Sequence, residues 1–132
     1  MTANDPVHAF LEARGCPDDV VAGGLEGLIA AWERSVKQTE AGYPLGLDDY
    51  LNDLDGRQLL EDALEVASEI ERAAAAARIS AADARMRRVV RPVSECLWGS
   101  RVADQEGWAA DRNWWYFSVP NEPGPILRED LE

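Results

Sequence analysis

The clearest structural signal in the chain is the segment at residues 18–40, which reads DDVVAGGLEGLIAAWERSVKQTE. Its apolar side chains recur at intervals of three and four residues, which places them along one side of an α-helix. These side chains are Val21, Leu25, Leu28, Trp32 and Val36. Asp18-Asp19 stands at the start, where the helix dipole favours negative charge. The segment therefore predicts a long amphipathic helix.

Shorter helical patterns flank this segment. Asp5-Pro6 predicts the N-cap and the first position of a helix near the N-terminus. Residues 47–54 predict a short helix that ends at Asp55-Gly56, with the aspartate capping the next helix. Apolar spacing over residues 60–77 predicts that next helix, and the pair Ser80-x-x-Asp83 fits the capping box of a further one.

The last third of the chain has a different character. Residues 93–98 and 114–119 are rich in aromatic and β-branched side chains, which favours two strands paired antiparallel. The three prolines of residues 120–132 predict an extended or loosely attached tail. The sequence thus predicts a mainly α fold: over residues 1–119, a single-domain helical bundle of four to five helices with a small C-terminal two-stranded antiparallel β element.

Composition narrows the classes of partner. The chain has 132 residues, of which 25 are acidic and 13 basic, and its net charge is −12. This charge disfavours attraction to nucleic acid or to an anionic membrane surface. No apolar run approaches the roughly 20 residues that a membrane-spanning helix needs. We therefore expect neither a nucleic-acid partner nor a membrane partner.

The N-terminus and the cysteines bear on the cellular compartment. The first ten residues, MTANDPVHAF, lack the basic patch and apolar stretch of a signal peptide. Cys16 and Cys96 match no metal-ligand spacing, and two isolated thiols fit a reducing compartment. The expectation is a cytoplasmic protein without a disulfide and without a cofactor.

Charge is distributed unevenly along the chain. Residues 1–71 hold sixteen acidic and four basic side chains, residues 72–101 hold seven arginines against two acids, and residues 102–132 hold seven acids against two basic side chains. We expect arginines of the middle segment to contact carboxylates, within the chain or across a subunit interface, rather than phosphates. The residues concerned are Arg85, Arg87, Arg88 and Arg91.

The acidic run at residues 48–56 raises the question of calcium binding. If Gly56 is the turn glycine of an EF-hand loop, Asp53 and Asp55 fall at ligand positions. The first ligand position is then Leu51, which has no oxygen to offer, and the last holds an aspartate in place of the usual glutamate. A short helix with a solvated acidic face is the favoured interpretation, and no metal site is predicted.

Signals for catalysis are weak. His8 is the single histidine, and no serine lies in a nucleophile-elbow context. The chain also has no glycine-rich phosphate loop, because Gly23, Gly24 and Gly27 lie within a helical pattern. No catalytic residue is predicted, and a non-enzymatic protein is favoured over an enzyme.

Aromatic residues gather near the C-terminus, where four of the five tryptophans lie between residues 98 and 115. In a strand, successive side chains point to opposite faces, so we expect Trp114 and Trp115 to face opposite ways. One face should pack on Leu60, Leu64 and Ile70. The other face should be exposed as an interaction surface, because aromatic and arginine side chains dominate protein-binding hot spots.

These observations favour a non-enzymatic acidic protein-binding module. An acidic, compact helical protein suits the neutralisation of a basic partner, as immunity proteins and antitoxins do, and self-association through the same surface is a further possibility. The predicted partner-binding residues are Trp108, Arg112, Trp114, Trp115, Tyr116, Asp48, Asp49 and Asp53. The alternative is a small-ligand or metal-binding protein, with enzymes included in this class, that uses the aromatic C-terminal element.

Overall fold

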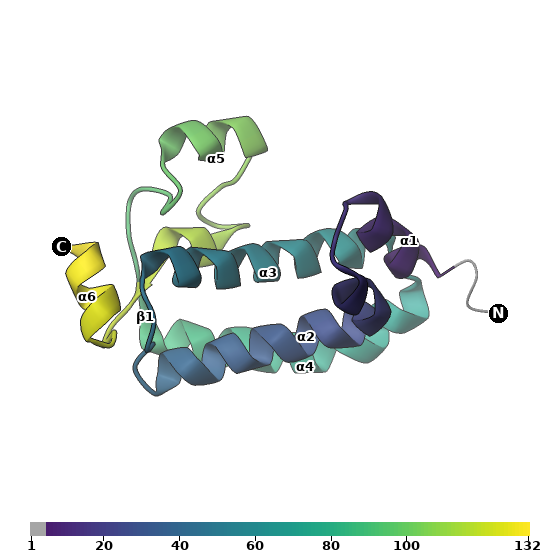
Figure 1. Cartoon of the computed structure of the whole chain (residues 1–132), viewed down its shortest axis with the longest axis horizontal. Coiled ribbons are helices and arrows are strands. Elements are labelled where there is room, and N and C mark those ends of the chain that lie inside the picture. The colour runs from purple at the N-terminus through teal and green to yellow at the C-terminus, as the bar shows by residue number, and fades with distance from the viewer. Residues whose placement is uncertain (1–4) are drawn as a thin grey trace.

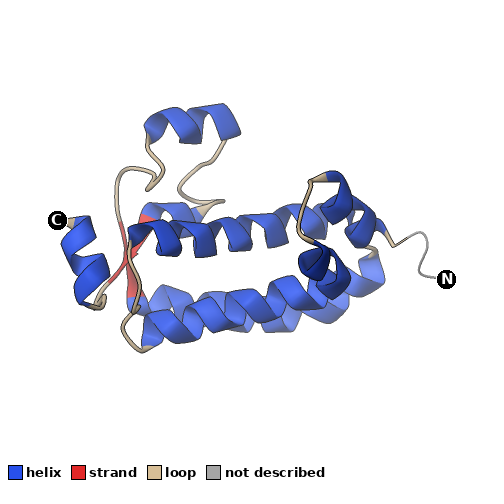
Figure 2. Ribbon diagram, viewed as in Figure 1, coloured by secondary structure: helices blue, strands red, loops and turns tan. Residues whose placement is uncertain are grey.

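The computed structural model describes residues 5–132, and over this range the chain is mainly α-helical, as the sequence predicts (Figure 1, Figure 2). The elements in chain order are α1 (Pro6–Ala13), α2 (Asp18–Glu40), α3 (Leu47–Val66), α4 (Glu69–Val89), β1 (Val90–Pro92), α5 (Ser100–Glu106), the 3-10 helix η1 (Trp114–Phe117), β2 (Ser118–Pro120) and α6 (Pro125–Leu131).

The three long helices α2, α3 and α4 form the body of the molecule, and α1 packs against α2 and α3 (Figure 1). Each long helix turns an apolar side toward the others, so the three sides meet in one core. Large buried side chains of this core include Trp32, Val36, Leu54, Leu60 and Met86. The two-stranded element, α5 and α6 lie around this body.

Local signals place the first two helices correctly. The Asp5 carboxylate accepts hydrogen bonds from the backbone N–H groups of Val7 and His8, at 2.9 and 3.3 Å, which confirms the predicted cap. Within α2, Gly24 has φ +57° and interrupts the helical geometry. A Cβ at this position would lie 2.8 Å from His8 Nε2, so this glycine lets α1 approach α2 closely.

The predicted helix break at Asp55-Gly56 is wrong, because α3 runs through it without interruption. A glycine inside a helix costs about 1 kcal/mol relative to alanine, which burial of the flanking apolar side chains offsets. The real break lies at Ala67, followed by Ser68, whose side chain forms a reciprocal capping box with Glu71. The proposed box at Ser80-x-x-Asp83 lies inside α4 instead.

The antiparallel two-stranded element exists, but its strands are displaced from the predicted ones. β1 pairs with β2 so that Arg91 lies opposite Val119. Residues 93–98 form no strand, and residues 114–117 form the 3-10 helix η1. A 3-10 helix has about three residues per turn, so strand alternation does not apply to its side chains. The expected exposure of one aromatic face at Trp114 and Trp115 is wrong, because both indoles are buried.

The expectation of an extended tail is also wrong, since residues 125–131 form α6. Pro125 occupies the first turn, where its fixed φ and missing N–H suit a helix start. Two hydrogen bonds attach this helix to the turn between α2 and α3. The Gly124 N–H donates to the Tyr43 carbonyl at 3.1 Å, and the Asp130 carboxylate accepts from the Leu47 N–H at 2.9 Å. Within α6, the Leu127 side chain is fully buried.

Replacing Leu127 by alanine should therefore lower the free energy of unfolding by about 2–5 kcal/mol, because a buried leucine is lost and a cavity remains. Ile126→Ala is the matched control, since the neighbouring Ile126 side chain is 54% exposed. Urea unfolding followed by circular dichroism measures both variants. Equal, small effects of the two substitutions would show that α6 does not dock.

Candidate functional site

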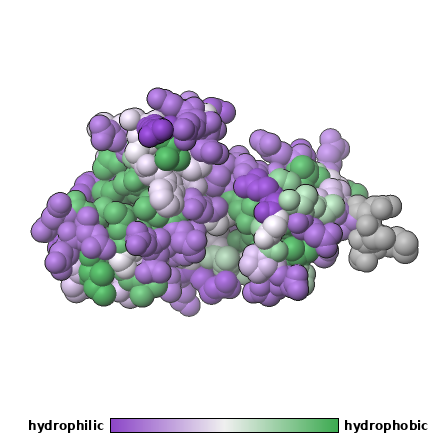
Figure 3. Space-filling model, turned by 45° about the horizontal axis from the view of Figure 1, so that its top comes forward, coloured by the Kyte–Doolittle hydropathy of each residue, from purple (hydrophilic) through white to green (hydrophobic). Residues whose placement is uncertain are grey.

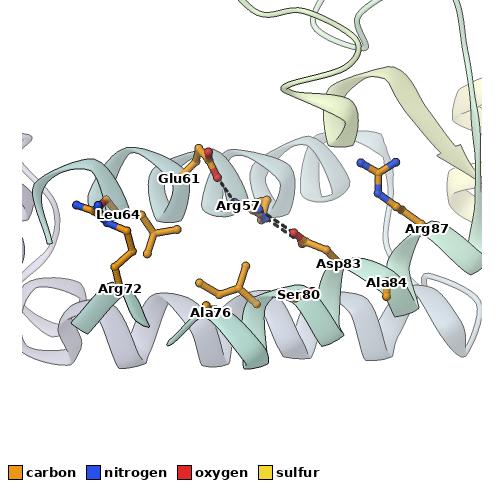
Figure 4. Close-up of a pocket in the computed structure, with 10 residues that line it drawn as sticks. Arg57, Glu61, Leu64, Arg72, Ala76, Ser80, Asp83, Ala84 and Arg87 are labelled. Atoms are coloured by element: carbon orange, nitrogen blue, oxygen red, sulfur yellow. Dashed lines mark hydrogen bonds and ion pairs between the residues drawn. The ribbon is translucent and has the colours of Figure 1, made fainter. Parts of the chain in front are cut away.

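Among residues 5–132, the most deeply buried charge lies between α3 and α4 (Figure 4). Arg57 donates to both Asp83 oxygens, from Nε at 3.1 Å and from Nη2 at 2.9 Å, and to Glu61 Oε1 from Nη1 at 3.0 Å. The Trp32 indole N–H also donates to Asp83, at 2.8 Å. The guanidinium is thus held by two carboxylates, one of which an indole further restrains.

Aromatic rings complete the surroundings of Arg57. Its guanidinium carbon lies 4.3 Å from the Trp115 ring centroid and 6.0 Å from that of Trp32, both within cation–π range. Burial lowers the pKa of Arg57, but the hydrogen bonds and charges of Asp83 and Glu61 outweigh burial and leave this pKa above its ordinary value. Arg57 is therefore a permanent cation in the core.

A groove of about 430 Å³ runs beside this ion network between α3 and α4. Figure 4 shows Arg72 and Arg87 toward opposite ends of it, with Leu64 and Ala76 between them. Arg72 donates to the Leu64 and Ala67 carbonyls, both at 3.0 Å, and so binds the last turn of α3. Arg87 lies over the Trp114 ring, at 4.2 Å. Since these groups are engaged within the chain, we assign the groove a structural role.

A second cavity, of about 720 Å³, lies between α3 and the segment that contains α5, and we call it the α3–α5 pocket. Its aromatic wall is Trp108 stacked on Tyr116, with ring centroids 3.9 Å apart and planes inclined by 17°. The Tyr116 hydroxyl donates to Asp55 at 2.6 Å, and burial together with this carboxylate raises the pKa of the phenol. The phenol therefore remains a protonated donor.

Carboxylates outnumber cations in the lining of the α3–α5 pocket. The acidic residues are Asp55, Glu61, Asp62, Glu65 and Glu106, and the basic ones are Arg14 and Arg112. Arg14 pairs with Asp62 at 3.3 Å, and Arg112 donates to the Gly107 carbonyl at 2.9 Å. Within residues 5–132, neither Glu65 nor Glu106 forms an ion pair. The pocket thus keeps a negative excess.

An amide network fixes the loop that carries Trp108. Asn113 donates from Nδ2 to Gln58 Oε1 at 2.9 Å and accepts from the Ala109 N–H at 3.0 Å. Gln58 in turn donates to Asp62 at 3.0 Å. These bonds tie the loop after α5 to the exposed side of α3, so the indole of Trp108 has a defined position in the wall.

The structure unites only part of the predicted partner-binding set. Trp108, Arg112 and Tyr116 line the α3–α5 pocket together. Trp114 and Trp115 instead pack beneath Arg87 and Arg57 respectively, inside the molecule. The aromatic element was expected to pack on Leu60, Leu64 and Ile70, yet Ile70 is 83% exposed.

The predicted acidic residues fall into two environments. Asp48 and Asp49 are exposed in the first turn of α3. Asp53 accepts a hydrogen bond from the Tyr43 hydroxyl at 2.7 Å, and burial raises its pKa more than this bond lowers it. We therefore assign Asp53 an internal role and leave Asp48 and Asp49 on the acidic surface.

The arginines of the middle segment, residues 72–101, form different kinds of contact within the chain. Arg85 pairs with Glu40 of α2, as predicted, and this contact lowers the pKa of that glutamate. Arg87 instead lies over Trp114, and Arg91 donates to the Pro120 carbonyl at 3.1 Å. Arg78, another arginine of the segment, pairs with Glu26 and Glu33. Two of these three ion pairs therefore link α4 to the middle of α2.

Sequence reasoning missed Arg57 as the centre of the core. Its signal was position: it lies three residues after Leu54 and three before Leu60, on the apolar stripe of α3. A charged residue on such a stripe needs a partner of opposite charge in the interior. Asp83 of α4 is that partner for Arg57.

No protein-family model, curated protein or solved structure matches the chain. None of the helices in residues 5–132 combines the length and apolar character needed to cross a membrane. In the same range, no three His, Cys, Asp or Glu side chains converge as metal ligands would.

Proposed function

We propose that the protein is a non-enzymatic acidic module that binds a basic protein partner through the solvent side of α3 and the adjoining α3–α5 pocket. One observation carries the proposal. α3 holds seven acidic residues and one basic residue, and that basic residue, Arg57, is only 4% exposed. All the charged side chains that α3 itself contributes to the surface are therefore acidic.

Internal pairing keeps the basic segment from neutralising this surface. Arg78 and Arg85 bind glutamates of α2, and Arg87 lies over Trp114. Figure 3 shows mostly hydrophilic residues over the protruding part of the molecule that contains α5. A surface of one charge sign steers an oppositely charged partner and rejects like-charged ones. This suits the neutralisation of a basic protein, as an immunity protein or antitoxin would achieve it.

Neutralising three acids of this surface tests the proposal. The variant Asp48→Asn, Asp49→Asn, Glu65→Gln should weaken binding of a fluorescent peptide of alternating lysine and arginine about tenfold at 50 mM salt. The control is Glu12→Gln, Asp19→Asn, Glu69→Gln, which makes the same change in net charge at exposed positions elsewhere. Fluorescence anisotropy gives both affinities. If the two triple variants bind equally, the α3 surface is not the binding face.

A second candidate function rests on the volume of the α3–α5 pocket, about 720 Å³, which lies within the range of small-ligand sites. An aromatic wall with a few fixed polar groups is also typical of such sites. Self-association through the acidic surface is less favoured, because two copies would bring like charges together. We place the protein in the cytoplasm, a proposal supported by the free thiols of Cys16 and Cys96.

A further inference from the structure

We infer that the α3–α5 pocket receives the guanidinium group of an arginine side chain from the partner, stacked on Trp108. The inference rests on the proposed function and specifies the chemistry of its central contact. The inference is based on a cavity in which an aromatic wall, a negative excess and unpaired carboxylates occur together.

The use of tryptophan elsewhere in the molecule supports this ligand. Arg57 lies over the rings of Trp32 and Trp115, and Arg87 lies over that of Trp114. Within residues 5–132, no lysine or arginine of the chain lies over Trp108. Tyr116 covers one face of that indole, and the ring lines the cavity. A cation from a partner would give Trp108 the cation–π contact that three other tryptophans, Trp32, Trp114 and Trp115, already make with arginines of the chain.

Acceptors for such a cation are present around the ring. Glu65 and Glu106 are exposed and form no ion pair in the described residues. Asp55 accepts hydrogen bonds from Tyr116 and Trp98, and both bonds go to the same oxygen, Oδ1. The chain's own cations are engaged, Arg14 with Asp62 and Arg112 with a carbonyl. A guest guanidinium would therefore find unpaired carboxylates beside an aromatic face.

Geometry favours arginine over lysine. The guanidinium is planar, so it stacks on an indole and still donates from its edge to two carboxylates. An ammonium is a compact, strongly hydrated charge that gains less from such a wall. Glu106 ends α5, and Gly107, with φ +74°, turns the chain directly into Trp108, which brings the carboxylate and the ring to the same cavity.

The test uses three small probes: the acetylated N-methylamides of arginine, of lysine and of citrulline, the neutral analogue of arginine. Two-dimensional NMR of the labelled protein separates the five indole N–H signals. The arginine probe should shift the Trp108 signal with a dissociation constant of roughly 1–10 mM. We expect the citrulline probe to bind at least tenfold more weakly and the lysine probe several-fold more weakly.

Variants assign the effect to the pocket. Trp108→Leu should abolish the shifts of neighbouring signals, and Trp108→Phe should retain part of the affinity because an aromatic face remains. Glu106→Gln should weaken binding several-fold, whereas Glu69→Gln, an exposed glutamate on α4, should leave it unchanged. The four other indole signals report whether each variant keeps the fold.

The outcomes separate this inference from the proposed function. If the basic peptide binds through α3 while the arginine probe leaves Trp108 unaffected, the inference is wrong and the proposed function stands. Equal binding of citrulline and arginine overturns the inference and favours the small-ligand alternative. Equal or tighter binding of lysine rejects the stacked guanidinium. If the probe binds but the peptide does not recognise α3, the protein-binding proposal itself fails.

Discussion

Replacing Arg57 by alanine should lower the free energy of unfolding by about 3–5 kcal/mol, because removing one member of a buried ion pair leaves the other charge without a partner. The substitution takes three hydrogen bonds from Asp83 and Glu61 and removes the cation over Trp115. Chemical denaturation followed by tryptophan fluorescence measures the loss.

Two comparisons make this result specific. Arg78→Ala removes two exposed ion pairs and should change stability only slightly, since water screens such contacts. The double variant Arg57→Met, Asp83→Leu should cost less than Arg57→Ala alone, because no uncompensated aspartate remains. A loss for Arg57→Ala no larger than for Arg78→Ala would contradict the assignment of a buried charge centre.

Replacing Trp115 by alanine should cost about 3–5 kcal/mol, the range for deleting a large buried aromatic side chain. The indole is 2% exposed and lies directly beneath the Arg57 guanidinium. The effect should therefore appear as loss of stability, in contrast to the loss of association expected of an interface residue.

Trp98→Ala provides the matched control for this second expectation. Trp98 is 41% exposed, and its main polar contact is one hydrogen bond to Asp55 at 3.0 Å. Losing that bond should cost about 1 kcal/mol. Thermal melts of both variants distinguish the roles, and similar melting temperatures would mean that Trp115 is not part of the core.

Short-range signals made the first two helices predictable. The Asp5 cap and the apolar stripe of α2 are encoded within a few residues of where they act. The boundary between α3 and α4 was not predictable in this way, because both Ser68 and Ser80 are followed three residues later by an acid that could close a capping box. Packing of the whole bundle selects Ser68.

Long-range contacts explain the errors near the C-terminus. Aromatic composition favours a strand at residues 114–117, yet the Tyr116 hydroxyl and the Asn113 amide bind Asp55 and Gln58, which lie more than fifty residues earlier. The same holds for α6, whose contacts reach back to Tyr43 and Leu47. Such pairings carry no signal in a local window of sequence.

The sequence predicted which residue types form the candidate site, but it did not predict how they are arranged in space. Clustered aromatic and acidic residues predicted Trp108, Arg112 and Tyr116 as a group, and the structure places these three around one cavity. Four of their five acidic neighbours come from α3, far earlier in the chain, and only Glu106 is close to them in sequence. Strand alternation wrongly added Trp114 and Trp115 to the group, because η1 turns both into the interior.

The buried Arg57–Asp83 pair also restricts the alignment of α3 with α4. A slide of one helical turn moves a side chain by about 5.4 Å, well beyond the 2.9 Å bond between Nη2 and Oδ2. None of the residues one turn from Asp83 on α4 carries a negative charge: they are Ile79, Ser80, Met86 and Arg87. An all-aliphatic interface could tolerate several registers with similar apolar contact; this charged pair is compatible with one.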